Sequence, residues 1–549
     1  MDPAAHRLSI TRILNDKNFN AYGRKQAAWN YIIEQENRVG SRFIRTKDGG
    51  LFMLIGSSRD IAPISKRGGD RITSYLYNMY GIADHDAYGK AIYKFLHAHA
   101  YENATIVELR RFSAFVSKSR TAYLSAYNGK MWKISGDKDP ELISNGEDEI
   151  FFADDDGGLP TQSDVGPHDI LFKQLTDLNY SKSGMSGITP QQQAMALMIW
   201  VFALAFPDMM PTKPLLILEG AAGSGKSAGI QLIQLALMGD IRPIIIQKHH
   251  EDDFGVLLLR APIAIFDNTD SYIEWVADAV CSYTTLGKFI KRKLYSDDEQ
   301  VIIKPHAFIA VASKNPTSFR REDVADRCVI LRLDRRTGFK RMGKLCEQIN
   351  SLRPRLVGEY LWYVNRIIEE IRSGAMDESD ENETSRMADF ATFSRVVARV
   401  MNWKPEAIDE LMDVLQRERD AFVNEGDPLV ELLRKWVAYR PRFGPANVGR
   451  EVALQALFLE LETLADASGI QFYKTPNTLA QKLRSPHVSR DFTIEMDATG
   501  GHKTYRIYRK TDPRLEVIDG GLTFDESAET LTEEEDPIGP DLEPKTNEK

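Results

Sequence analysis

A glycine-rich stretch near the middle of the chain has the residue types that bind phosphate. It runs Gly220-Ala-Ala-Gly-Ser-Gly-Lys226-Ser227 and fits G-x-x-x-x-G-K-[ST] at every fixed position. Backbone N–H groups of such a loop point into one concavity, and its glycines let a phosphate approach the main chain. Lys226 is expected to contact β- and γ-phosphates, and the Ser227 hydroxyl to ligate Mg²⁺. The expected cofactors are ATP and Mg²⁺, and the expected cradle is Gly220, Ala221, Ala222, Gly223, Ser224, Gly225, Lys226 and Ser227.

An acidic residue at the end of an apolar run supplies the second part of such a site. Ala264-Ile-Phe-Asp267 has the form of a Walker B strand, and Asp267 is expected to hold the water shell of Mg²⁺. Many P-loop ATPases have a water-activating Glu at the next position, where this chain has Asn268. The group that orients the attacking water therefore stays open, with Asp270 and Glu274 as candidates.

These residues need a parallel sheet to bring them together. The P-loop lies between a predicted strand, 215–218, and a predicted helix, 228–237. Strands that alternate with helices favour an α/β fold with a parallel sheet and its ligand at the carboxyl ends of the strands. Further strands are expected at 243–247, 264–267, 307–312 and 329–333, within an ATPase core that spans 169–345.

Two segments beyond Asp267 carry a family resemblance. One contains Gly287-Lys-Phe-Ile-Lys-Arg-Lys-Leu-Tyr-Ser-Asp-Asp-Glu299, and the other is Arg321-Glu-Asp-Val-Ala-Asp-Arg327. They resemble motifs of the superfamily 3-like AAA+ helicases, in particular the phage, prophage and virus-type primase-helicase group. The resemblance covers about residues 40–425 and is specific over 215–333.

The resemblance implies a ring-forming, ATP-driven DNA translocase, which is a homo-oligomer and by expectation a hexamer. It implies that Arg327 is an arginine finger that completes the site of a neighbouring subunit. It also implies that Ser313 or Asn315, after the strand 307–312, is the polar sensor beside the γ-phosphate. The expected catalytic residues are Lys226, Asp267, Ser313, Asn315, Arg321 and Arg327.

The stretch 287–295 has the composition of a segment that binds single-stranded DNA. Four of the six residues from Lys288 to Lys293 are cations, and Phe289 and Tyr295 can stack on bases. In the resembling family this interval is a hairpin in the central channel of the ring. A solvated basic strand is the alternative, and Arg292 is a candidate to contact ATP instead. The expected DNA contacts here are Lys288, Lys291, Arg292, Lys293 and Tyr295.

The N-terminal region, 1–153, is expected to be an α+β domain, joined to the core by a linker at 154–168. Asp84-His85-Asp86 has the Asp-x-Asp form of a primase metal site, but it opens a helical pattern, so no polymerase-type primase site is predicted. Hairpins are expected at 42–55 and 121–134, the second turning at Asn128-Gly129, and helices at 72–80, 86–98 and 106–119.

The region after the core divides into helices and a smaller domain. Residues 346–427 are expected to form a helical lid or connector with an acidic break at 377–383. Residues 428–510 have the order of a winged helix, with a recognition helix at 477–484 and wing strands at 492–496 and 504–509. A winged helix that contacts only protein is the alternative. The expected DNA contacts are Lys482, Arg484 and Lys503.

Charge and composition limit the partners. The net charge is −9, but residues 511–549 hold 13 Asp and Glu against 3 Lys and Arg, so basic contacts elsewhere must be local. This acidic tail is expected to be disordered, either as a solvated tail or as a docking segment for a replication partner. The longest apolar run, 194–206, is too short for a membrane span, and three scattered cysteines suit a reducing compartment, so a cytoplasmic protein without membrane contact is expected.

Together these features predict a ring-forming, ATP-dependent DNA translocase or helicase that acts in phage, prophage or plasmid replication. Two alternatives stay open. One is an AAA+ loader or remodelling switch in a replication or defence complex that does not unwind DNA. The other is a DNA-binding regulator whose P-loop only senses nucleotide.

Overall fold

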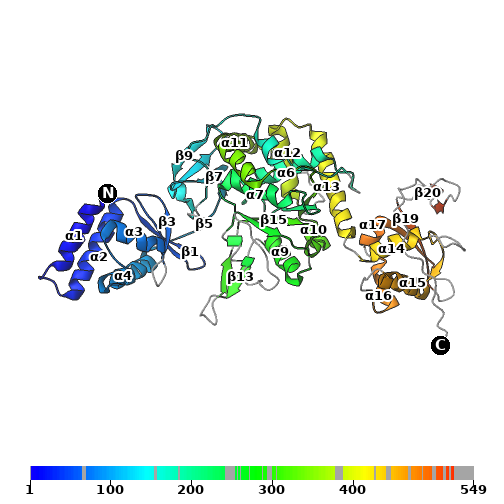
Figure 1. The fold of residues 1–549 in the computed structure, drawn as a ribbon, viewed down its shortest axis with the longest axis horizontal. Helices are drawn as coiled ribbons and strands as arrows, with labels where there is room; N and C mark the ends of the chain where they lie inside the picture. Colours follow the sequence, from blue (N-terminus) through cyan, green and yellow to red (C-terminus); the bar gives the residue numbers. More distant parts are fainter. Residues whose placement is uncertain are drawn as a thin grey trace. The chain divides into compact units, whose positions relative to one another are not determined.

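The computed structural model divides the chain into two compact units, Met1–Ala421 and Phe422–Lys549. Figure 1 shows the elements in chain order. The structure describes residues 2–64, 70–153, 157–182, 186–241, 254–255, 258–259, 261–270, 272–286, 289–292, 300–303, 306–376, 387–425, 428–439, 447–467, 472–484, 486–497, 503–510, 515–518 and 521–524.

The first unit begins with four helices and a sheet that share a small core of their own. The predicted hairpin at 42–55 is confirmed, since β1 and β2 pair antiparallel. Asp86 caps α4 by accepting a hydrogen bond from the Gly89 N–H at 2.6 Å, which confirms that this carboxylate opens a helix. The elements are α1 Pro3–Asn15, α2 Ala21–Arg38, β1 Arg42–Thr46, β2 Leu51–Leu54, β3 Ile61–Ile64, α3 Asp70–Tyr80, α4 Ala87–Asn103 and β4 Thr105–Val107, with sheet order β3-β2-β1-β4.

The helix predicted at 106–119 is wrong, because this segment forms three short strands. They are β4, β5 Leu109–Arg110 and β6 Ser113–Val116. Each strand pairs with a strand that is distant or later in the chain: β4 with β1, β5 with β10 Phe151–Phe152, and β6 with β7. The partners of β4 and β5 lie outside any local window of sequence, so the local apolar pattern favoured the wrong period there, whereas β6 pairs with the strand that follows it.

A second sheet, β6-β7-β8-β9, covers the central core. It contains β7 Thr121–Ala126, β8 Lys130–Ile134 and β9 Glu141–Ser144. The β7–β8 turn is at Asn128-Gly129, as predicted, with both residues in the left-handed region at φ 61°. Leu124 and Trp132 join the same hydrophobic core as Leu216, Ala310 and Val329 of the central sheet. The core therefore does not follow the domain boundary expected at residue 153.

The central sheet is parallel and has the order β12-β15-β11-β16. The strands predicted around 215–218, 264–267, 307–312 and 329–333 are confirmed, while 243–247 lies outside the described residues. Helix α6 is buried along almost its whole length and lies against the sheet. The elements are α5 Leu171–Leu175, α6 Pro190–Ala203, β11 Leu215–Gly220, α7 Lys226–Met238, β12 Ile263–Asp267, α9 Glu274–Leu286, β15 Phe308–Ser313, α10 Glu322–Ala325 and β16 Cys328–Leu333.

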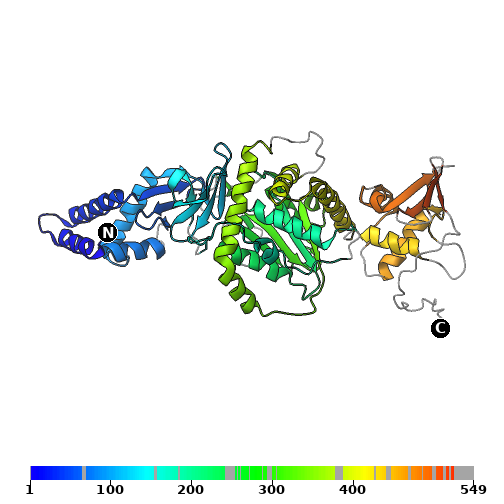
Figure 2. The same cartoon turned by 90° about the horizontal axis from the view of Figure 1, so that it is seen from above.

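Between β12 and β15 the chain makes an antiparallel pair, β13 Phe289–Arg292 and β14 Gln300–Ile303. After β16, three helices follow: α11 Met342–Arg372, α12 Ala388–Val400 and α13 Pro405–Glu425. Helix α11 packs against α7 and α12, and Figure 2 shows it running the height of the core. The predicted helical character of 346–425 is thus confirmed for the described residues.

Among its described residues, the second unit has three helices, a small three-stranded sheet and a further short helix. Its core includes Trp436, Leu457, Leu479 and Tyr505. The order of helices and strands is the one expected at 428–510, with α17 added between the predicted recognition helix and the first wing strand. The elements are α14 Pro428–Ala438, β17 Val452–Ala453, α15 Leu454–Ala467, α16 Pro476–Lys482, α17 Pro486–Asp491, β18 Phe492–Asp497 and β19 Thr504–Arg509.

The acidic tail contains a two-stranded hairpin. Strands β20 Leu515–Ile518 and β21 Gly521–Phe524 pair antiparallel, so the expectation of a disordered tail is wrong for these residues. The rest of 511–549 lies outside the described residues. Across the part of the chain that the structure describes, no helix is both long and apolar enough to cross a membrane.

Candidate nucleotide site

The P-loop joins the carboxyl end of β11 to the amino end of α7, and its glycines are required by the backbone path. Gly223 and Gly225 have φ of 82° and 88°, which favours glycine over residues with a side chain. A Cβ at Gly220 would lie 2.4 Å from the Leu333 carbonyl oxygen. The backbone of the loop therefore follows the path that the motif predicted, and its use as a phosphate cradle stays a prediction.

Two residues expected to act together do lie together. The Ser227 hydroxyl donates to Asp267 Oδ1 at 2.9 Å, which joins the P-loop helix to the end of β12. The Lys226 ammonium donates to the Ala221 carbonyl oxygen at 3.2 Å and so lies within the loop. Ser227 and Asp267 offer the hard oxygen ligands that Mg²⁺ prefers, so the residues present fit this ion. Among the described residues no group of three or more His, Cys, Asp and Glu forms a metal site.

Asp270 ties the loop after β12 to the end of β15. Its Oδ1 accepts hydrogen bonds from the Ser313 hydroxyl at 2.5 Å, the Lys314 N–H at 2.8 Å and the Asn315 N–H at 3.0 Å. Burial works against ionisation, but these hydrogen bonds and the Lys226 charge hold the pKa of Asp270 below its ordinary value. The other candidate for orienting water, Glu274, is exposed in the first turn of α9.

Arg327 lies at the opposite end of the sheet from its own P-loop. Its carbonyl oxygen accepts from the Leu215 N–H at 2.9 Å, at the start of β11, whereas the P-loop begins at Gly220. At ~3.3 Å per residue the length of β11 separates them by about 17 Å, which is beyond the reach of an arginine side chain. The Arg327 guanidinium instead donates to the Asp323 carbonyl oxygen.

Arg321 lies near Arg327 and is likewise engaged within its own chain. Its guanidinium pairs with Asp278 and with Asp323, each at 2.6 Å. In a single subunit, therefore, the structure brings together Lys226, Ser227 and Asp267 but not the two predicted arginines.

Residues after β16 lie over the P-loop, and no sequence motif predicted this. The Arg336 N–H donates to the Gly223 carbonyl oxygen at 3.2 Å, and the Phe339 ring lies 3.2 Å from where a Gly223 Cβ would be. A cavity of about 200 Å³ adjoins Gly223 and Gly225, lined also by Leu178, Leu232, Phe339 and Ile349. The signal that could have found them is their position just beyond β16, the strand paired with β11.

Buried ion pairs hold the strand that leads into the P-loop. Glu219, the residue before Gly220, contacts Arg320 at 2.6 Å and Arg332 at 3.3 Å. Arg332 also pairs with Glu418 of α13. The side chains of Glu219 and Arg320 are each only 9% exposed, so this pairing is shielded from solvent. The cluster connects the P-loop strand to the sensor side of the sheet and to α13.

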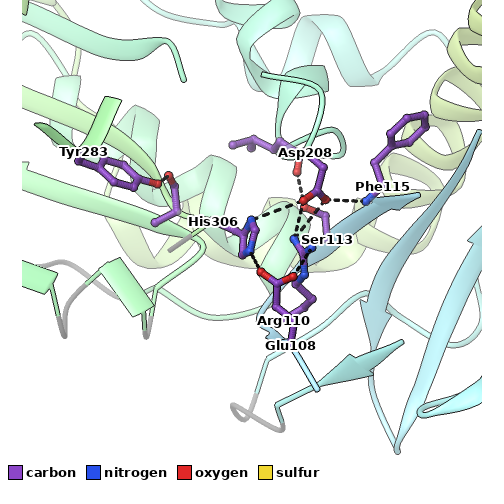
Figure 3. A network of polar contacts seen from close by, with 9 residues as sticks. Glu108, Arg110, Ser113, Phe115, Asp208, Tyr283 and His306 are labelled. Carbon is purple, nitrogen blue, oxygen red and sulfur yellow. Dashed lines mark hydrogen bonds and ion pairs between the residues drawn. The ribbon is translucent and has the colours of Figure 1, made fainter. Parts of the chain in front are cut away.

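A second polar network connects the start of β15, at the end of the central sheet opposite the P-loop, to β5 and β6 (Figure 3). Asp208 accepts from Arg110 at 2.9 Å and from the Phe115 N–H at 2.9 Å. His306, just before β15, contacts Glu108 at 2.6 Å. Burial is the main cause that lowers the pKa of His306. The network therefore joins β5 and β6 to the point where the chain returns from β14 to β15.

The residues predicted to contact DNA fall into two groups. Lys291 and Arg292 lie in β13 of the hairpin, while Lys288, Lys293 and Tyr295 lie outside the described residues. In the second unit Lys482 is exposed at the end of α16 and Lys503 is exposed just before β19. Arg484, two residues beyond α16, lies 3.3 Å from the sulfur of Met496 in β18, the strand predicted as part of a wing.

Comparisons with known proteins cover different parts of the chain. Residues 184–404 match a family model described as "Actinomycete integrative conjugative element replication protein". No curated protein matches the chain. Similar solved structures include "SCCmec type IV Cch - active helicase", with 11% identity and a TM-score of 0.42, covering 85% of this chain and 93% of that one. Another is "The A form apo structure of NrS-1 C terminal region-CTR", with 9% identity and a TM-score of 0.43, covering 88% and 98%.

The family match coincides with the residues that build the site. It spans the P-loop, Asp267, the sensor strand and Arg327. The matched span includes the two segments that carry the sequence resemblance described above, 287–299 and 321–327. The segment 184–404 of this chain therefore matches the replication proteins of actinomycete integrative conjugative elements.

Proposed function

We propose that this protein is an ATPase that translocates on or unwinds DNA during replication of a mobile genetic element. The observation that carries the proposal is the contact between Ser227 and Asp267 at the mouth of the P-loop. A hydroxyl from the phosphate-binding helix and a carboxylate from the end of another strand of the same sheet are the protein groups that an NTPase of this class places beside its ion. The family match supplies the replication setting.

Each part of the site has a role in this proposal. The P-loop N–H groups and Lys226 bind the β- and γ-phosphates, and the cavity beside Phe339 receives the base. Ser227 and Asp267 would hold Mg²⁺, which when bound neutralises charge on the phosphate oxygens. Phosphoryl transfer depends mainly on electrostatic stabilisation and little on acid–base catalysis, which explains why the site consists mainly of hydrogen-bond donors and charged groups.

The proposal includes an oligomer, because the predicted finger cannot serve its own site. Arg327 lies at the amino end of β16, far from the P-loop of the same chain. A ring, by expectation a hexamer, would place Arg327 of one subunit against the nucleotide of the next. The hairpin β13–β14 is then the proposed contact with single-stranded DNA in the channel, and the acidic tail a proposed docking segment for a replication partner.

A paired assay tests the proposal. Wild type, Lys226→Ala and the control Lys404→Ala, an exposed lysine outside the site, are compared for ATP hydrolysis and for unwinding of 3′- and 5′-tailed duplexes. Lys226→Ala should lower the hydrolysis rate by about 10²–10³-fold, because charge on the phosphates loses its cation, and should keep the fold. Lys404→Ala should match wild type. Hydrolysis without unwinding would support the loader or switch alternative, and near-normal hydrolysis by a folded Lys226→Ala protein would exclude this site.

A further inference from the structure

We propose that Asp270 is the positioning residue of the sensor turn, defined as Ser313–Asn315, and that it aims the Asn315 side chain at the γ-phosphate. The inference deepens the proposed ATPase function and rests on it. It also decides between the two polar residues that compete for the sensor role, since it assigns the nucleotide contact to Asn315 and a supporting contact to Ser313.

The geometry of one carboxylate oxygen is the first argument. Asp270 Oδ1 accepts one hydroxyl and two consecutive backbone N–H groups, all from the sensor turn, at 2.5–3.0 Å. Two consecutive backbone donors on one oxygen fix the orientation of the peptide plane before Asn315. The direction in which the Asn315 side chain leaves the backbone is therefore set by Asp270.

Within the sensor turn, Ser313 and Asn315 differ in exposure and in the group that contacts Asp270. Ser313 is fully buried, and its hydroxyl proton is directed at Asp270. Asn315 is exposed, and the contact that Asp270 makes with it is to its backbone N–H. The Ser313 hydroxyl is thus committed inside the protein, whereas the Asn315 amide lies on the side of the turn that solvent, and hence a nucleotide, can reach.

The described residues of the loop after β12 make further contacts with the end of β15 and with the residues beyond the sensor turn. The Asn268 N–H donates to the Ala312 carbonyl oxygen at 3.0 Å, and the Ile273 N–H donates to the Ser318 hydroxyl at 2.7 Å. Asp270 lies between these two contacts. The loop with Asp270 at its centre therefore holds Asp267, the residue expected beside Mg²⁺, in a fixed position relative to the sensor turn.

The charge of Asp270 suits this role better than a role as base. Its carboxylate is stabilised by three donors and by the nearby Lys226 charge, and a carboxylate stabilised in this way is a weak proton acceptor. In hydrolysis the water oxygen bonds to the γ-phosphorus while the bond to the β–γ bridging oxygen breaks, and ADP leaves with that electron pair. The water proton goes to the released phosphate or to solvent, and the Asn315 amide donates a hydrogen bond to a γ-phosphate oxygen as its charge redistributes.

Steady-state kinetics on a double-mutant cycle tests this inference. Asn315→Ala should lower kcat by about 10²-fold, as for loss of one preorganised donor. Asp270→Ala should lower kcat by about 10–10²-fold, because a misplaced donor costs nearly as much as a missing one. The double variant should be no slower than Asn315→Ala alone, because Asp270 acts through Asn315. ATP affinity, measured by binding of a fluorescent nucleotide, should stay within about twofold of wild type in all three, since a contact that forms mainly in the transition state affects kcat.

Two further variants separate positioning from general stability. Asp270→Asn keeps size and an acceptor oxygen but loses the charge, so it should retain the melting temperature of wild type and fall between wild type and Asp270→Ala in kcat. Asp413→Asn, the same change at an exposed carboxylate of α13, should match wild type. Ser313→Ala removes one of the three donors and should cost kcat about 2–10-fold, the range for one hydrogen bond.

The outcomes distinguish the inference from the proposed function. A wild-type protein that hydrolyses ATP, together with effects of Asp270→Ala and Asn315→Ala that multiply, would overturn the inference and leave the ATPase assignment intact. The same holds if Asp270→Asn loses nucleotide affinity as strongly as it loses kcat. A wild-type protein with no ATP hydrolysis would overturn the proposed function and the inference together.

Discussion

The Ser227 hydroxyl donates to the Asp267 carboxylate at 2.9 Å, across 40 positions of sequence. Ser227 is set by the helix that follows the P-loop, and Asp267 by the end of a strand two places away in the sheet. Because parallel strands end at the same edge, the two side chains meet where the phosphates of a nucleotide would lie. This relationship is the reason to expect dependence on a divalent ion.

Removal of the divalent ion should abolish ATP hydrolysis. The substitution Asp267→Asn should raise the Mg²⁺ concentration needed for the half-maximal rate by about 10–100-fold, as for other residues that hold a metal indirectly. The neutral amide orients the water shell of the ion less well than the carboxylate does. Hydrolysis rates over a Mg²⁺ titration check this expectation, with Asp413→Asn as the matched control. An unchanged Mg²⁺ requirement in Asp267→Asn would remove Asp267 from the metal site.

Arg327→Ala should keep ATP binding and lower hydrolysis by about 10³–10⁵-fold, the effect of an arginine finger in other NTPases. Because Arg327 lies far from its own P-loop, Arg327→Ala mixed with Lys226→Ala should regain part of the wild-type rate. In such mixed assemblies some interfaces combine an intact P-loop with an intact finger. Arg355→Ala, an exposed arginine of α11, is the control and should behave as wild type. Assembled mixtures that show no regain would contradict a finger supplied in trans.

The double variant Lys288→Ala with Lys293→Ala should bind single-stranded DNA more weakly and flatten the log–log salt dependence by about 1.4 units, for two phosphate contacts at ~0.7 each. Lys288 and Lys293 directly flank β13 of the hairpin. DNA-stimulated hydrolysis should fall while the basal rate stays. Lys90→Ala with Lys94→Ala, two exposed lysines of α4, is the matched control. The hairpin assignment fails if the salt slope of the hairpin variant equals that of wild type.

Acidification should destabilise the first unit through His306. Burial lowers the pKa of His306 below 6.5, so the unfolded chain binds this proton more readily than the folded one does. Stability from this group is therefore complete above the unfolded pKa and is lost as the pH falls below about 6.5, at up to ~1.4 kcal/mol per pH unit. The groups that face His306 are Glu108, Asp208 and Arg110.

Melting temperatures between pH 7.5 and pH 5.5 check the His306 prediction. His306→Gln should show a smaller fall in melting temperature than wild type, because glutamine keeps polar contact with Glu108 without titrating. His85→Gln is the control, since His85 is exposed and should leave the wild-type pH dependence unchanged. Identical pH profiles for wild type and His306→Gln would show that another group governs acid stability.

The sequence by itself determined the parts of the site that depend on local pattern. The P-loop needs a fixed spacing of glycines, lysine and serine within eight residues. The apolar run before Asp267 likewise predicts a strand that ends at this residue. The hairpin turn at Asn128-Gly129 was equally local, because both residues must adopt a left-handed conformation there. These features follow from the chemistry of neighbouring residues, so no distant partner is needed to predict them.

Only the tertiary structure decided which distant groups meet. The contact of Asp270 with Ser313 spans 43 residues and that of Glu108 with His306 spans 198, and neither pair has a spacing that marks it. The first part of the segment 106–119 became strands because β1 and β10, which are distant in the sequence, pair with β4 and β5. Arg336 and Phe339 reached the P-loop because β16 pairs with β11 along its whole length. Sheet register and packing depend on the free energy of interactions among many residues that are distant in the sequence. No single stretch of sequence therefore predicts these contacts.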